Sequence, residues 1–328
     1  MEINRFTLAN GLRVVHVHDT TTAMVAVNTL YDVGARDESA HLTGMAHLFE
    51  HLMFSGTPDV PDFDAPLSAA GGMSNAWTSN DYTNFYDVLP AVNIETALWL
   101  ESDRMRGLAF SEKGLQVQKS VVIEEFKQVC LNQPYGDSDH ALRRLAYTVH
   151  PYRYPVIGKE FSHIEQVTPD DERRWFYSHY APNNAVLAIC GNVDAQTVRS
   201  LVEKWYADIP ARPIAPRDIP AEPLPDAPRS GVLAGNVPQT VLTIAYPMAP
   251  YGKQAYFEAD IISDVLANGQ ASRFYRELLM GTDMFTDIDA AIQGADEPGL
   301  FLINANLREN GREAEEQALR AIDAQLEK

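Results

Sequence analysis

One short segment of the chain combines residue types that can do metal chemistry. Residues 44–52 read GMAHLFEHL and contain His47, Glu50 and His51 in the order His-x-x-Glu-His. On a helix, positions i, i+3 and i+4 lie on one face with Cβ atoms about 5–6 Å apart, so two imidazoles can share one Zn²⁺. The carboxylate beside them can act as general base toward a water that the metal activates. The spacing predicts a zinc site with His47 and His51 as ligands and Glu50 as the catalytic base.

A catalytic zinc usually takes three protein ligands and leaves its fourth position for water, so another helix must supply the third ligand. The segment VVIEEF, residues 121–126, offers Glu124 and Glu125. Neighbouring residues on a helix point about 100° apart, so at most one of the two faces inward. Because Val121 and two further apolar residues fall on the side of Glu125, the pattern favours Glu125 as the ligand and leaves Glu124 in solvent.

Short strands and helices must position these side chains. The sequence predicts two strands within residues 4–19 and a third at residues 23–33. The motif lies on a helix from about Thr43 to Phe54, with Thr43 as N-cap and Gly56 as C-cap. A strand pair and two helices follow, at 74–90, 93–107 and 111–131. Strands mixed with helices, without strict β-α-β alternation, predict an α+β fold.

A proline-rich stretch at residues 210–230 is predicted to be an extended linker, because proline is excluded from helix interiors and central strands. After it the order of elements restarts. Residues 240–249 match residues 23–33, and residues 260–269 match residues 47–56. We therefore predict two homologous domains, each with an antiparallel sheet packed by helices.

The predicted domains are a zinc-bearing peptidase domain at residues 1–209 and a homologous non-catalytic domain at residues 231–328. In the second copy Asp260, Ser263 and Asp264 stand where the first has its metal motif, so only the first copy can hold the site. The second copy stops early, and roughly 100 residues that would complete it are missing. We expect an incomplete second domain and a chain that is a fragment of a longer protein.

Composition indicates which partners and which cellular compartment to expect. The formal net charge of −19 repels phosphate backbones, which argues against a nucleic-acid partner. Cys130 and Cys190 are far apart and show no metal-binding or disulfide spacing, which is typical of a reducing compartment. No apolar run reaches the roughly 18 residues of a membrane span. We expect a cytoplasmic protein, although a leader that has been removed would leave no trace.

Three segments together resemble the pitrilysin/insulinase family of zinc peptidases, the inverzincins, which includes the mitochondrial processing peptidases. The resemblance spans essentially the whole chain, including the duplicated domain and the linker. Its specific motifs are His47-x-x-Glu50-His51, Val-Val-Ile-Glu-Glu at residues 121–125, and Asn75-Ala76-x-Thr78.

The resemblance implies roles for individual residues. In the family the second glutamate of the Glu-Glu pair is the third zinc ligand, which implies that role for Glu125. The Asn-Ala-x-Thr segment is an edge strand that pairs with the substrate backbone, so Asn75, Ala76 and Thr78 are expected to bind extended peptides by β-augmentation. Family members enclose substrates between two such halves, which implies a homodimer or a heterodimer with a related subunit.

Two departures from the family pattern matter. Relatives carry a glutamate seven residues before the ligand, where this chain has Gln118. Peptidase members also carry an Arg and a Tyr seven residues apart in the second copy, which stabilise the oxyanion. Here Leu278 and Phe285 have that spacing, so the oxyanion arm is expected to be absent.

The sequence thus predicts a zinc metalloendopeptidase that hydrolyses extended peptides or unfolded polypeptides through a metal-activated water. One alternative is a zinc-binding subunit that is active only with a partner supplying the Arg/Tyr arm. Another is a non-catalytic assembly subunit, against which the intact zinc motif argues.

Overall fold

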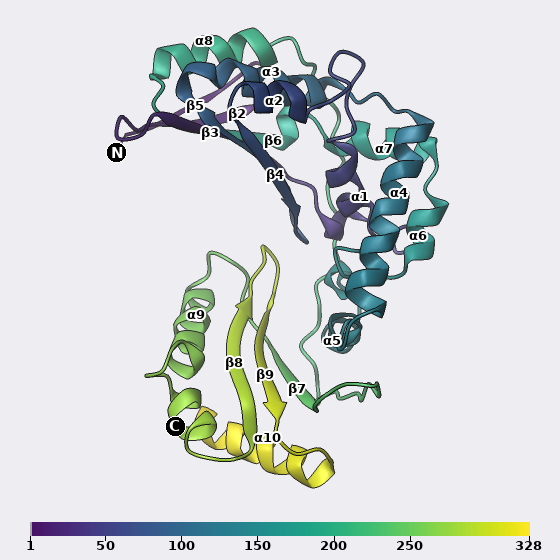
Figure 1. Cartoon of the computed structure of the whole chain (residues 1–328), viewed down its shortest axis with the longest axis vertical. Coiled ribbons are helices and arrows are strands. Elements are labelled where there is room, and N and C mark those ends of the chain that lie inside the picture. Colours follow the sequence, from purple (N-terminus) through teal and green to yellow (C-terminus); the bar gives the residue numbers. More distant parts are fainter. Residues whose placement is uncertain (1) are drawn as a thin grey trace. The chain divides into compact units, whose positions relative to one another are not determined.

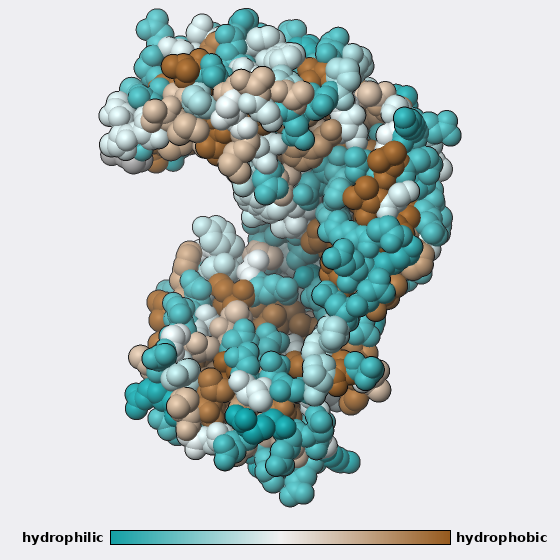
Figure 2. Space-filling model, viewed as in Figure 1, coloured by the Kyte–Doolittle hydropathy of each residue, from teal (hydrophilic) through white to brown (hydrophobic). Residues whose placement is uncertain are grey.

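A computed structural model describes residues 2–328 and divides them into two compact units. The first unit contains the residues up to Gln128 together with Tyr154–Ile219, and the second contains Val129–Arg153 and Pro220–Lys328. No helix in the described part of the chain is both long and apolar enough to cross a membrane. Hydrophilic residues cover most of the face seen in Figure 2, and apolar residues form separate patches on it.

A six-stranded sheet organises the first unit, in the order β1-β2-β6-β3-β5-β4. Neighbouring strands are antiparallel except β2 and β6, which run parallel. The strands are β1 (Ile3–Thr7), β2 (Arg13–His18), β3 (Met24–Tyr31), β4 (Met73–Thr78), β5 (Thr83–Pro90) and β6 (Ala185–Gly191). This order places β4, the strand expected to pair with substrate, at one edge of the sheet.

Helices cover the sheet and extend beyond its edge. They are α1 (Met45–Leu52), α2 (Asp64–Ala69), α3 (Ile94–Arg106), α4 (Glu112–Phe126), α6 (Phe161–Gln166), α7 (Pro169–His179) and α8 (Ala195–Tyr206). Figure 1 shows α3 and α8 over the sheet and α1 beside α4. Buried side chains from the sheet and from α1, α3, α4, α7 and α8 form one continuous apolar core. The α-helical part of the predicted 111–131 helix ends at Phe126, and a π-helical turn, Lys127–Leu131, follows.

The second unit has its own three-stranded sheet in the order β7-β9-β8. Its elements are α5 (Ser138–Ala146), β7 (Val241–Pro247), α9 (Gln254–Ala267), β8 (Phe285–Gln293), β9 (Leu300–Leu307) and α10 (Arg312–Leu326). Apolar side chains from α9, β8, β9 and α10 form a separate core. Figure 1 shows α9 and α10 packed on this small sheet.

The two sheets support the predicted duplication. Strands β3, β5 and β4 are adjacent in that order and antiparallel, and β7, β9 and β8 repeat the order and the orientation. Each set is followed by a helix, α3 in the first unit and α10 in the second. The prediction of an α+β fold with helix-packed sheets is confirmed.

The proline-rich linker contains neither helix nor strand, as predicted. Its first half belongs to the first unit, where Arg217 forms ion pairs with Asp32 and Asp37. Its second half belongs to the second unit, where Glu222 accepts hydrogen bonds from the amides of Val149 and His150. The observed units also differ from the predicted ranges, because residues 129–153 group with the second unit.

Candidate metal centre

Helix α1 divides its side chains between the core and a polar face. Met45, Ala46, Leu48, Phe49 and Leu52 are buried in the apolar core. The intervening residues His47, Glu50 and His51 lie on the other side, as the helical spacing predicts. The two imidazole rings are neighbours, with centroids 4.9 Å apart.

Helix α4 brings Glu125 to the two histidines. The Nε2 atom of His47 lies 3.7 Å from Oε1 of Glu125, and Nε2 of His51 lies 3.5 Å from Oε2. One ligand atom from each residue can be chosen so that all three lie within 4.8 Å of one another. The three side chains predicted as zinc ligands therefore converge on one small volume.

The other candidate, Glu124, points away into solvent. Its side chain is 72% exposed and pairs with Lys127 at 2.7 Å. Val121 is also 45% exposed, so the prediction that it shares the buried side of Glu125 is wrong. The buried face of α4 instead follows Leu115, Lys119, Val122 and Phe126. Glu125 lies at the border of this face, where a half-buried carboxylate can reach the histidines.

The donor set fits a zinc ion. Burial, together with a smaller effect of the neighbouring His51, lowers the pKa of His47 to about 4. A neutral imidazole is the form that binds a metal, and two imidazole nitrogens with one carboxylate oxygen form a common catalytic zinc set. Nδ1 of His47 is buried and has no hydrogen-bond partner among the described residues.

Glu50 is held by the edge strand. Thr78, the last residue of β4, donates a hydrogen bond of 2.6 Å from Oγ1 to Oε2 of Glu50. Burial raises the pKa of Glu50, and the bond from Thr78 opposes that shift. Sequence reasoning assigned Thr78 to substrate binding and missed this contact, because no spacing rule connects a strand end to a helix 28 residues earlier.

The other two predicted substrate residues also lie on β4. Asn75 and Ala76 pair with Tyr86 and Phe85 of β5, and within residues 2–328 no strand pairs with the other side of β4. The side-chain oxygen of Asn75 accepts a hydrogen bond of 2.8 Å from the Ala76 amide. The edge of β4 can accept an added strand, although the Ala76 amide already donates a hydrogen bond to the side chain of Asn75.

The beginning of α1 differs from the prediction. The predicted N-cap, Thr43, does not cap the helix, because its hydroxyl lies 2.9 Å from Nδ1 of His163 and accepts a bond from the amide of Lys159. Gly44 is the N-cap residue and makes no side-chain cap bond. The amides of Gly44 and Ala46 donate instead to Glu38, at 2.7 and 2.8 Å. Glu38 lies in the loop before the helix and belongs to none of the predicted motifs.

The positions that depart from the family pattern carry no acid or oxyanion donor. Gln118 is half-buried on α4, seven residues before Glu125. Leu278 and Phe285 are 2% and 0% exposed and pack in the core of the second unit. The two residues that have the expected Arg/Tyr spacing are therefore structural.

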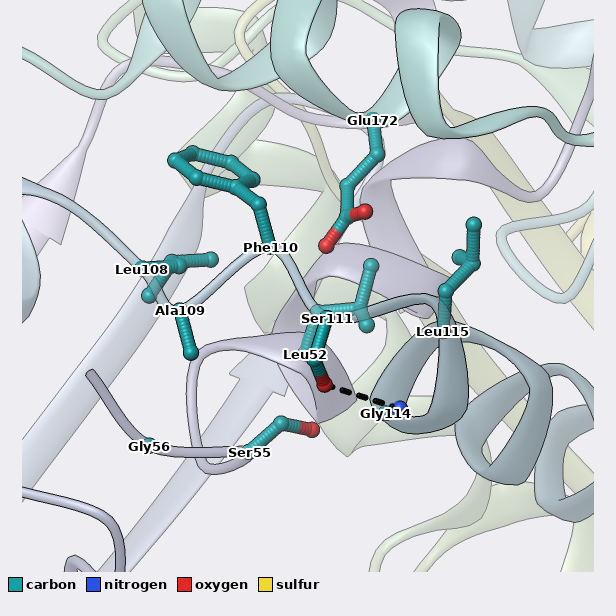
Figure 3. A pocket seen from close by; sticks show the side chains of 10 residues that line it. All are labelled: Leu52, Ser55, Gly56, Leu108, Ala109, Phe110, Ser111, Gly114, Leu115 and Glu172. Carbon is teal, nitrogen blue, oxygen red and sulfur yellow. Dashed lines mark hydrogen bonds between the residues drawn. The ribbon is translucent and has the colours of Figure 1, made fainter. Parts of the chain in front are cut away.

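A polar pocket lies at the C-terminal end of α1, apart from the metal centre (Figure 3). Figure 3 shows the carboxylate of Glu172 reaching down from α7 toward Ser111 and Ser55. Glu172 is 2% exposed, and neither its Oε2 nor the hydroxyl of Ser55 has a hydrogen-bond partner in the described part of the chain. Burial raises the pKa of Glu172 to about 7.

Comparison with known proteins defines the class that this fold and site belong to. Residues 13–159 match insulinase (peptidase family M16), and residues 166–328 match the peptidase M16 inactive domain. The chain belongs to the M16 (insulinase) family of peptidases.

Individual relatives agree with this class. The chain is 30% identical over 281 residues to the zinc protease PqqE of Helicobacter pylori, covering 83% of this chain and 63% of that protein. It is 25% identical over 282 residues to the uncharacterized zinc protease YmxG of Bacillus subtilis, covering 84% of this chain and 66% of the relative. The chain thus spans somewhat under two thirds of the length of these relatives.

Solved structures share the fold. A protease from Helicobacter pylori superimposes with a TM-score of 0.90 at 27% identity, covering 98% of this chain and 79% of that one. Pitrilysin superimposes with a TM-score of 0.80 at 17% identity, covering 99% of this chain and 36% of its own, which shows the fold alone.

Proposed function

We propose that the chain is a zinc-dependent endopeptidase, with His47, His51 and Glu125 as metal ligands and Glu50 as general base. The observation that carries the proposal is the convergence of three ligand atoms within 4.8 Å, contributed by two different helices. The names of the relatives, which are zinc proteases, support the same metal and the same class of reaction.

The protein side chains divide the work of peptide hydrolysis. A bound zinc ion acidifies water and polarises a carbonyl group. Glu50 is placed to accept the proton from the attacking water and to pass it to the leaving amine. The hydroxyl of Thr78 holds one oxygen of Glu50 and leaves the other for that proton. The partly buried position of Glu50 strengthens its electrostatic interactions by excluding water.

Substrate is proposed to bind as an added strand on β4. Main-chain hydrogen bonds to an open sheet edge give affinity without demanding particular side chains. Asn75 and Ala76 lie on that edge, and Thr78 ends it beside Glu50. An extended peptide or unfolded polypeptide paired with β4 therefore passes the proposed base.

A second candidate function is a zinc-binding subunit that needs a related partner for activity. It is favoured by the burial of Leu278 and Phe285, which leaves the expected oxyanion positions without donors. In both cases the proposed assembly is a dimer of related halves.

Metal analysis and peptide cleavage test the proposal. Purified protein is loaded with zinc and incubated with a mixed peptide pool, and products are identified by mass spectrometry. We expect one zinc per chain, and cleavage that is abolished in Glu50→Gln while the zinc is retained. Loss of zinc in His51→Ala supports the ligand assignment.

The outcomes separate the two candidates. Cleavage by the chain alone supports the independent peptidase, whereas cleavage only after a related subunit is added supports the partner-dependent form. Absence of zinc from the wild-type protein, or zinc retained unchanged in His51→Ala, overturns the metal site itself.

A further inference from the structure

The geometry points to Glu38 as a positioning residue for the helix that carries the zinc motif. We propose that its carboxylate takes the place of the capping side chain that the N-cap residue of α1 lacks. It thereby holds the first turn of the helix, which carries His47 toward the proposed metal site. The inference rests on the proposed zinc site and adds a residue outside the motifs to it.

Helix α1 begins without a capping side chain at its N-cap position. The first amides of any helix lack partners within the helix and need acceptors from elsewhere. The usual acceptor is an N-cap side chain, but Gly44 occupies that position. Oε2 of Glu38 accepts from the Gly44 amide at 2.7 Å, and Oε1 accepts from the Ala46 amide at 2.8 Å. Glu38, six positions before Gly44, therefore supplies the acceptors that an N-cap side chain usually supplies.

The site around Gly44 excludes a local cap. Gly44 has a φ of +87°, a conformation that favours glycine. A Cβ atom there would also lie 2.8 Å from Cδ1 of Ile164 and 3.0 Å from the carbonyl oxygen of Ile157. A serine or aspartate cannot occupy the position without displacing these atoms. The acceptor has to come from another part of the chain, and Glu38 provides it.

The position of His47 explains why this cap bears on the metal. Helix α1 has only eight residues, and helices this short are marginal without tertiary support. His47 is its third residue and directly follows Ala46, whose amide is held by Glu38. Fraying of the first turn would move the imidazole of His47 away from Glu125, while His51 one turn later would keep its place.

Glu38 is suited to the role by its two acceptor oxygens and by its half-buried position. A carboxylate near a helix N-terminus is favoured by the helix dipole. Burial raises the pKa of Glu38 to about 8, even though the bonds from Ala46 and Gly44 oppose that shift. Each of its two oxygens accepts one amide, so the carboxyl group satisfies two backbone donors at the start of α1.

The test compares Glu38→Ala with a matched control in the same unit. Asp194 is the N-cap of α8, and one of its oxygens accepts the amides of Gln196 and Thr197 at 3.0 and 2.9 Å. Asp194→Ala therefore removes a helix-capping carboxylate remote in sequence from the zinc motif. The readouts are the zinc dissociation constant from chelator competition, the visible spectrum of the Co²⁺-substituted protein, and amide exchange of residues 44–48 in the metal-free protein.

We expect Glu38→Ala to weaken zinc binding by about 10-fold or more, to change the Co²⁺ spectrum, and to accelerate exchange at residues 44–48. Glu38→Gln, which keeps one acceptor oxygen, should give intermediate values. Asp194→Ala should leave all three readouts near those of the wild type. If Glu38→Ala does not fold, the zinc affinity and the amide exchange of Glu38→Gln alone test the proposal.

The proposal is overturned if Glu38→Gln, or a folded Glu38→Ala, matches wild type in zinc affinity and in exchange at residues 44–48. It is also overturned if Asp194→Ala weakens zinc binding as much as Glu38→Ala, because the effect is then one of general stability. If the wild-type protein binds no zinc, the proposed function fails, and the exchange of metal-free protein still decides whether Glu38 holds the turn.

Discussion

Thr78 and Glu50 join the edge strand to the helix that carries the His-x-x-Glu-His motif through one hydrogen bond of 2.6 Å. Thr78 ends β4, and Glu50 lies on the polar side of α1 between the two histidines. The strand proposed to bind substrate and the residue proposed to move the proton therefore hold each other in place. A change at the strand end should alter catalysis without altering the metal ligands.

Thr78→Val is expected to lower kcat/KM by about 10- to 100-fold, because Glu50 loses the donor that fixes its orientation. The valine keeps the shape and the strand propensity of threonine, so β4 should persist. Steady-state cleavage of a fluorogenic peptide measures the loss. Thr78→Ser keeps the hydroxyl and should retain most of the activity. Equal losses in both variants, or zinc lost from Thr78→Val, would contradict the assigned contact.

Glu125→Gln should weaken zinc binding by more than about 100-fold, because it removes an anionic ligand rather than a residue that supports one. Glu124→Gln is the matched control, since the side chain of Glu124 is 72% exposed and pairs with Lys127. Competition with a chromophoric chelator measures both affinities. Similar affinities for the two variants would show that Glu125 is not a ligand.

Glu172→Gln should stabilise the protein at alkaline pH. Burial raises the pKa of Glu172 from 4.5 to about 7, so the folded state holds this proton more tightly than the unfolded state does. The resulting stability is complete below about pH 4.5 and is lost as pH rises toward 7. Glutamine cannot ionise, so the variant should raise Tm by about 2–4 °C at pH 8 and have little effect at pH 4.

Thermal unfolding at the two pH values measures this difference, with Glu203→Gln as the control. Glu203 is a half-exposed glutamate on α8 in the same unit. A Tm that rises equally at pH 4 and pH 8 in Glu172→Gln would mean that packing, and not ionisation, causes the change.

Glu222→Gln should loosen the segment around residues 148–150. Although partial burial raises the pKa of Glu222, bonds from the His150 amide and from Thr148 and Val149 lower it to about 2. Its contribution is therefore present above about pH 4.5 and lost as pH falls through about 2. Limited proteolysis near neutral pH should cut the variant faster within this segment. Glu309→Gln, an exposed change in the same unit, should leave the cutting rate unchanged.

The sequence predicts that the proposed zinc ligands His47 and His51 lie together, because their spacing follows a local rule of helix geometry. Helical spacing places His47 and His51 together, whereas the choice of Glu125 over Glu124 rested partly on Val121, which is exposed, and is supported by the family resemblance. The family resemblance implies the edge position of β4, whereas the strand order is first seen in the structure.

Two contacts could not be found in this way. Glu38 reaches the start of α1 from a loop, and its role arises because backbone packing leaves no room for a side chain at Gly44. The bond from Thr78 to Glu50 depends on how β4 pairs with β5 and meets α1, which is a long-range property. Residues 129–153 joined the second unit for the same kind of reason, since Tyr147 and Tyr152 pack with Leu300.

The grouping of residues 129–153 with the second unit limits how the chain can be divided into separate proteins. The polypeptide passes between its units at Gln128, at Arg153 and again at Ile219, so the proline-rich linker is only one of three crossings. A shortened protein that stops at residue 209 keeps His47, His51 and Glu125. It lacks Leu300, against which Tyr147 and Tyr152 pack. The two halves are interleaved along the chain, and neither can be cut out as a single continuous piece.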